Sequence, residues 1–118
     1  MATQISDSVT FSPAQVDLLS LLAYQHMQNG NPERALLYLE ALKELQISDN
    51  KIYLSLAYSL LQCGRALDAL TVLDDKKYSK SLEPLAYLFR GRALTLLGRL
   101  PEASQAMRRF IHFRQIEK

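Results

Sequence analysis

The side chains in this sequence best suited to metal binding or nucleophilic chemistry are two histidines and one cysteine, His26, His112 and Cys63. A zinc site needs such residues in closely spaced sets, and neither histidine has a Cys, Asp or Glu partner at the required spacing. Cys63 stands beside Gly64 at a predicted turn, where a small apolar thiol packs easily, and no sequence neighbour marks it as an activated nucleophile. The sequence therefore predicts no metal site and no catalytic residue.

Longer catalytic motifs are missing as well. The sequence contains no glycine-rich phosphate loop, no Gly-x-Ser-x-Gly elbow and no acidic pair in a context that would form a cleft. We therefore expect a protein that is not an enzyme and that needs no cofactor.

Composition narrows the class of protein further. The 118 residues, 48% of them apolar, suffice for one domain with a core but not for two. A net charge of +2 is far from the basic stripe that nucleic-acid binding needs, so we expect no nucleic-acid partner. The single cysteine, the lack of a signal-like N-terminus and the lack of a long apolar run predict a cytoplasmic chain without membrane insertion.

An internal repeat organises the chain that would have to position any functional side chain. Gly30, Gly64 and Gly98 are separated by two intervals of 34 residues, which is the period of the tetratricopeptide repeat (TPR). In the same frame small residues recur five positions after each glycine and seven positions before it, namely Ala35, Ala69 and Ala103, and Ala23, Ala57 and Gly91. Small residues are needed where two helices touch closely, and glycine favours the turn between them.

The frame predicts an all-α protein in which three TPR repeats form a short right-handed solenoid. The repeats cover residues 16–49, 50–83 and 84–117 of a single domain at 13–118, which follows a mobile N-terminal tail at 1–12. Ser12 and Gln15 form a predicted capping box around the first helix start. All four prolines (Pro13, Pro32, Pro84 and Pro101) fall at or near helix starts, where a missing N–H is tolerated.

Two segments depart from the TPR pattern. Ile47 stands where the pattern favours proline, and the polar run at 74–80 should fray into a loop. We therefore predict that the second helix of the middle repeat is the shortest and that it ends near Lys76.

The first helix of each TPR lines a concave groove, and the family geometry selects the residues that face it. Carried over to this chain, it gives Tyr24, Met27, Leu54, Tyr58, Leu61, Leu85, Leu88 and Arg92. Such an apolar lining favours an apolar or amphipathic segment of a protein partner. The alternatives are that the chain's own tail or a second copy covers it. A carboxylate clamp of the chaperone-cofactor type is disfavoured, because Tyr24 and Tyr58 stand where that clamp uses asparagine.

The last predicted helix offers a candidate second interface at Met107, Phe110 and Phe113, because no further solvating helix follows before Lys118. This stripe would serve self-association or docking, unless it packs wholly against the preceding helix. The basic residues nearby, Arg108, Arg109, Arg114 and Lys118, either touch acidic partners or form a solvated face.

The stretches at 11–42, 60–70 and 87–113 resemble the small TPR chaperones of bacterial type III secretion systems, in particular the YscY/SctY family. This resemblance implies a chaperone of the bacterial cytoplasm, peripheral to the secretion apparatus, that binds a small secreted SctX/YscX-like protein as a heterodimer. It also implies that the chaperone presents this partner to the export gate protein. A chaperone of a needle or translocator subunit and a self-associating TPR scaffold are the alternatives.

Overall fold

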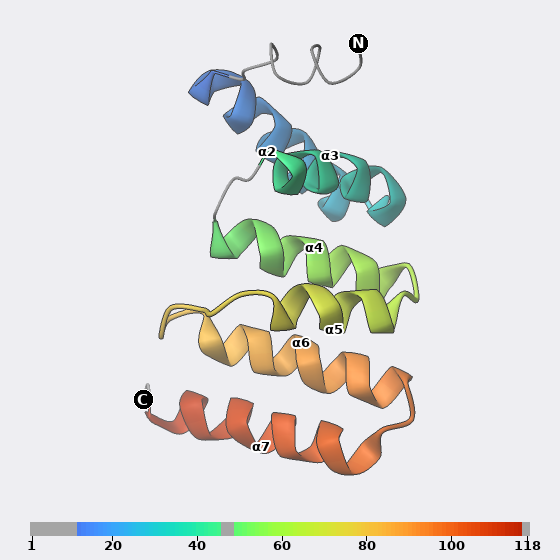
Figure 1. Ribbon diagram of the computed structural model, residues 1–118, viewed down its shortest axis with the longest axis vertical. Helices are drawn as coiled ribbons and strands as arrows, with labels where there is room; N and C mark the ends of the chain where they lie inside the picture. Colours follow the sequence, from blue (N-terminus) through green and yellow to red (C-terminus); the bar gives the residue numbers. More distant parts are fainter. Residues whose placement is uncertain (1–11, 46–48, 117–118) are drawn as a thin grey trace.

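The computed structural model describes residues 12–45 and 49–116, which form six α-helices and no β-strand (Figure 1). In chain order the helices are α2 (Pro13–Gln28), α3 (Pro32–Glu44), α4 (Asn50–Gln62), α5 (Ala66–Asp74), α6 (Glu83–Leu96) and α7 (Leu100–Ile116). The prediction of an all-α protein is confirmed. The predicted tail at 1–12 and Ile47 lie outside the described residues, apart from Ser12.

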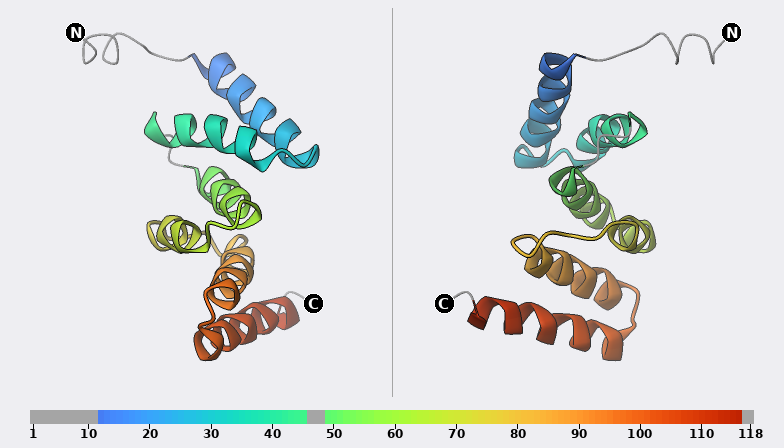
Figure 2. Two further views of the ribbon diagram at one scale, coloured as in Figure 1. Left: turned by 90° about the vertical axis from the view of Figure 1, so that its right-hand side faces the viewer. Right: turned by 60° about the vertical axis from the view of Figure 1, so that its left-hand side comes forward.

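The helices pack as three hairpins, α2 with α3, α4 with α5 and α6 with α7, stacked along the longest axis of the molecule (Figures 1 and 2). Each helix packs against the next one along the chain, and α4 also packs directly against α6. The corresponding contact between α2 and α4 is marginal at most. The first helices of the second and third hairpins are therefore in closer contact than those of the first and second.

The three tight turns inside the hairpins share one backbone conformation. Gly30, Gly64 and Gly98 have φ values of 74°, 77° and 76°, a left-handed region that glycine enters without steric cost. In the first turn the Asn31 N–H donates to the His26 carbonyl at 2.8 Å and the Gly30 N–H donates to the Met27 carbonyl at 3.4 Å. The other two turns repeat this pair of bonds, which is the Schellman arrangement that closes a helix end.

The small residues of the 34-residue frame lie where the paired helices touch. Ala23, Ala57 and Gly91 are buried, as are the alanines at 35, 69 and 103. At Gly91 the approach is closest: a Cβ atom built there would lie 2.5 Å from Met107 Sδ of α7. The expectation that small side chains permit close helix contact is confirmed.

The predicted helix ends are also confirmed. Ser12 Oγ accepts from the Gln15 N–H and the Gln15 side chain accepts from the Ser12 N–H, which forms the capping box at the start of α2. All four prolines lie in the first turn of a helix. The shortest of the six helices is α5, which ends at Asp74, two residues before the predicted end.

One hydrophobic core runs through the stack, with unequal contributions from the helices. Seven residues of α4 are buried, whereas α2 buries only Ala23. The two helices differ in burial because α4 packs against three other helices, whereas α2 packs mainly on α3. Among the helices of the described ranges, none has both the length and the apolar character needed to cross a bilayer.

Candidate functional site

An apolar hollow of about 500 Å³ opens along the side formed by α2, α4 and α6. Each of these three helices supplies at least two side chains to it. We call it the apolar groove, and it is lined by Tyr24, Met27, Lys51, Leu54, Ser55, Tyr58, Leu82, Leu85 and Phe89.

The two tyrosines of the groove are held by the same local bond, one repeat apart. Gln28 Nε2 donates to the Tyr24 hydroxyl at 2.6 Å, and Gln62 Nε2 donates to the Tyr58 hydroxyl at 3.0 Å. The Tyr58 ring also lies 5.6 Å from the ring of Phe89, measured between centroids. Each hydroxyl keeps its own proton for donation, so the groove combines oriented aromatic surface with hydrogen-bond donors.

A smaller hollow of about 210 Å³ continues the apolar groove between α2 and α4. It shares Tyr24, Met27, Lys51 and Ser55 with the groove, and it extends to the core residues Leu39 and Leu42 of α3. This extension exists because α2 does not pack closely on α4 as α4 does on α6. A bulky apolar side chain entering there would reach the edge of the core.

Charge is sparse in this region. Of the described residues, Lys51 is the one charged residue that lines the apolar groove, and Asp49 joins it in the smaller hollow. The Asp49 carboxylate caps α4 by accepting from the Lys51 N–H at 2.8 Å, while the Lys51 ammonium makes no ion pair within the described ranges. An amphipathic segment with one acidic side chain would match this lining.

Five of the eight predicted groove residues line the hollow, namely Tyr24, Met27, Leu54, Tyr58 and Leu85. The prediction was wrong for Leu61, which is 4% exposed and belongs to the core. Leu88 is half-buried against that core, and Arg92 is exposed but does not line the groove. Leu54 is also largely buried, so it forms the floor and offers a partner little surface.

Sequence reasoning missed Phe89 and Leu82 as lining residues. Phe89 lies one helical turn beyond Leu85, and this spacing places both on one face of α6, a signal that the sequence contains. Leu82 precedes α6 in the segment that follows α5. Asn50 fastens that segment to α4, because its side chain donates to the Lys77 carbonyl at 3.3 Å and accepts from the Ser79 N–H at 3.2 Å. That long-range bond pair has no sequence signature.

The predicted second interface on α7 is only partly available. Met107 packs against Gly91, and the Phe113 ring stacks on Tyr87 of α6 with centroids 5.7 Å apart. Phe110 is half-buried, with the Arg114 guanidinium 5.9 Å from its ring. The three predicted residues therefore lie on the side of α7 that meets α6 or border it, while Leu100 and Ile111 are the large exposed apolar residues within the stretch 100–114 of this helix.

The reactive side chains of the sequence are separated in the structure. His26 stacks on Tyr38 with ring centroids 5.6 Å apart, and His112 lies at the opposite end of the stack. Burial raises the pKa of the Cys63 thiol above its ordinary value, and the Glu33 carboxylate acts in the same direction, so the unreactive thiol form is favoured. No metal-binding cluster of His, Cys, Asp and Glu occurs among the residues that the structure describes.

The arrangement is suited to holding an apolar segment of another protein. The apolar groove presents oriented aromatic rings, aliphatic side chains and the Lys51 ammonium, which together fit an amphipathic helix. The chain matches no family model, and no curated protein matches it.

Proposed function

We propose that the chain is a TPR domain whose three repeats form a right-handed solenoid, and that it acts by binding another protein rather than by catalysis. Support for the repeat family comes from the three glycine turns of one conformation and the buried small residues in the same 34-residue frame. The observation that carries the binding function is the apolar groove. It exposes Tyr24 at 56% and Leu85 at 38%, which is costly in water without a partner.

The resemblance to the YscY/SctY family makes this proposal more specific. We propose a type III secretion chaperone of the bacterial cytoplasm that works at the periphery of the secretion apparatus. It holds a small secreted SctX/YscX-like protein as a heterodimer in the apolar groove and delivers it to the export gate protein. An apolar partner segment kept in this groove would stay soluble until export, because its apolar face would be covered.

Co-expression with an SctX-like protein tests the proposal. We expect a one-to-one complex by size-exclusion chromatography with light scattering. Tyr24→Asp combined with Leu85→Asp should abolish it, since two carboxylates would be buried against an apolar partner. Both residues are exposed in the free chain, so its helicity should be unchanged.

The matched control is Leu37→Asp combined with Leu67→Asp. It makes the same change in charge at two exposed leucines, on α3 and α5, that do not line the groove. This control should form the complex as the unmodified chain does. Complex formation that survives the groove variant would place the partner elsewhere, and homodimerisation with no SctX-like complex would favour the self-associating scaffold.

A further inference from the structure

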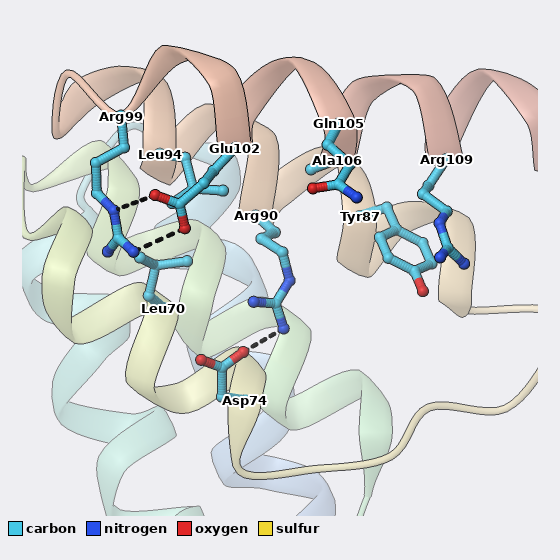
Figure 3. A pocket seen from close by; sticks show the side chains of 10 residues that line it. All are labelled: Leu70, Asp74, Tyr87, Arg90, Leu94, Arg99, Glu102, Gln105, Ala106 and Arg109. Carbon is cyan, nitrogen blue, oxygen red and sulfur yellow. Dashed lines mark hydrogen bonds and ion pairs between the residues drawn. The ribbon is translucent and has the colours of Figure 1, made fainter.

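A second hollow, of about 380 Å³, lies between α5, α6 and α7 and differs in character from the apolar groove (Figure 3). Arginine side chains from two helices converge on it: Arg90 comes from α6, Arg109 comes from α7, and Arg99 comes from the turn that precedes α7. We call it the arginine hollow. Its remaining lining residues are Leu70, Asp74, Tyr87, Leu94, Glu102, Gln105 and Ala106.

The three guanidinium groups are only partly satisfied by their neighbours. Arg90 donates to the Asp74 carboxylate through Nη2, and its other nitrogens have no hydrogen-bond partner within residues 12–45 and 49–116. Arg99 donates to Glu102 through Nε at 2.9 Å and through Nη2 at 2.8 Å. Arg109 makes no hydrogen bond or ion pair with any described residue, and its guanidinium lies 5.9 Å from the Tyr87 ring centroid. Each arginine has five N–H donors, so many donors around this hollow have no partner among the residues that the structure describes.

The net positive charge of the chain is concentrated in the hairpin that contains the arginine hollow. Residues 83–118 carry seven Lys or Arg and three Asp or Glu, a net charge of +4. Residues 1–82 carry seven Lys or Arg and nine Asp or Glu, a net charge of −2. The small overall charge therefore conceals a basic last hairpin, and a negatively charged partner would be attracted to that end of the stack.

The arginine hollow and the apolar groove use opposite sides of α6. Leu85 and Phe89 line the groove, whereas Arg90 and Leu94 line the hollow, five positions further along in each case. At about 100° per residue, five positions correspond to a rotation of about 140° around the helix. A molecule in one site therefore does not obstruct the other.

We propose that the arginine hollow is a docking site for an acidic segment of a protein partner, whose Asp or Glu carboxylates are gripped by Arg109 and by the free donors of Arg90 and Arg99. Arginine suits this role because its planar fork matches the geometry of a carboxylate. Asp74 and Glu102 reduce the net charge of the lining to +1, too little for the phosphate backbone of a nucleic acid but enough for one or two carboxylates. Leu70, Leu94 and Tyr87 add apolar surface for the stem of such a segment.

A labelled, end-blocked peptide of alternating glutamate and alanine tests this site by fluorescence anisotropy at low ionic strength. The matching peptide of glutamine and alanine is the neutral probe, and a short single-stranded DNA is the polyanion probe. We expect the acidic peptide to bind, the neutral peptide not to bind, and the DNA to bind less tightly than the acidic peptide.

Two neighbouring arginines give a matched pair of variants. Arg109→Ala should weaken binding of the acidic peptide about tenfold through loss of charge-assisted hydrogen bonds. Arg108→Ala removes the same charge from the same helix at an exposed position outside the hollow, and it should leave the affinity unchanged. Glu102→Gln should tighten binding, because it removes a negative charge from the hollow and leaves one acceptor oxygen for the two Arg99 nitrogens that Glu102 now binds.

Equal losses of affinity for the acidic peptide in the Arg108 and Arg109 variants would overturn the proposal, since they would indicate diffuse electrostatic attraction to the basic last hairpin. Absence of acidic-peptide binding would also overturn it, and tighter DNA binding with the same dependence on Arg109 would assign the site to nucleic acid instead.

The inference is independent of the proposed groove function. Tyr24→Ala combined with Leu85→Ala, which changes no charge, should leave peptide binding unaltered.

Discussion

Replacement of Gly91 by alanine should destabilise this protein, although the same replacement at an open position of a helix stabilises it. Alanine is favoured over glycine in a helix interior by about 1 kcal/mol. At Gly91, however, the new Cβ would lie 2.5 Å from Met107 Sδ and 3.0 Å from Met107 Cγ. Carbon and sulfur atoms in ordinary contact are about 3.5–4.0 Å apart, so the Met107 side chain would have to move by about 1 Å. Overpacking of this kind costs about 1–3 kcal/mol, which leaves a net loss of about 1 kcal/mol.

Gly91→Ala should change from destabilising to stabilising when the Met107 side chain is shortened. In a Met107→Ala background the Sδ and Cγ atoms are gone, and the Ala103 carbonyl oxygen at 3.7 Å is in ordinary contact distance of the new Cβ. There Gly91→Ala should stabilise the chain by about 1 kcal/mol, the full helix-propensity term. The double-mutant cycle should therefore give a coupling free energy of about 2 kcal/mol between the two positions.

Urea denaturation of the four proteins, followed by circular dichroism, measures each free energy of unfolding, and thermal unfolding should shift by about 4 °C per kcal/mol. Gly98→Ala is the control. Its φ of 76° makes it costly by about 1–2 kcal/mol, but a Cβ there meets no atom within 4 Å, so its effect should be the same in both backgrounds. A stabilising effect of Gly91→Ala in the unmodified chain, or equal effects in both backgrounds, would refute the packing argument.

Three further changes test other parts of the structure. Ser59→Ala should raise the free energy of unfolding by about 1 kcal/mol, because the fully buried Ser59 hydroxyl has no hydrogen-bond partner in the described part of the chain and alanine is the better helix former. Urea denaturation measures this. Burial raises the pKa of Tyr78 to about 12, so an ultraviolet titration should show a tyrosine ionisation step near that pH, and Tyr78→Phe should remove this step. Since the unfolded chain ionises Tyr78 near pH 10, the stability contributed by its neutral form is complete below that pH and is lost as pH rises towards 12. Ser12→Ala should cost about 1 kcal/mol through loss of the capping box, and amide exchange should increase in the first turn of α2 if the cap acts locally.

Features set by local backbone geometry could be predicted from the sequence. The glycine turns, the proline positions and the capping box depend on residues a few positions apart, so a pattern of residue types is enough to locate them. The short α5 followed from the polar run after it, because Asp and Lys side chains cannot continue an apolar helix face. The buried small residues followed from the repeat period, since the same close helix contact recurs in each hairpin.

Features set by the displacement of one hairpin relative to the next could not be predicted in the same way. A uniform repeat frame treats Leu54 and Leu61 alike, as residues that face the groove. In the structure Leu54 floors the groove while Leu61 belongs to the core, and Phe89, outside the frame's groove positions, lines the groove in its place. The direct contact of α4 with α6 decides these outcomes, and that contact depends on rotations that residue types do not specify.

The contrast between α2 and α4 explains why α2 carries several exposed apolar side chains. Both helices are rich in Leu, Tyr and Ala, so their sequences alone predict similar burial. Burial depends instead on the number of neighbouring helices: α4 has three, and α2 packs mainly on one. Leu18, Leu21 and Tyr24 of α2 are consequently more than half exposed, and Tyr24 also lines the smaller hollow that extends the apolar groove. A partner helix placed there would supply α2 with the packing that α4 obtains from within the chain, and for this reason the groove should bind most tightly at its α2 side.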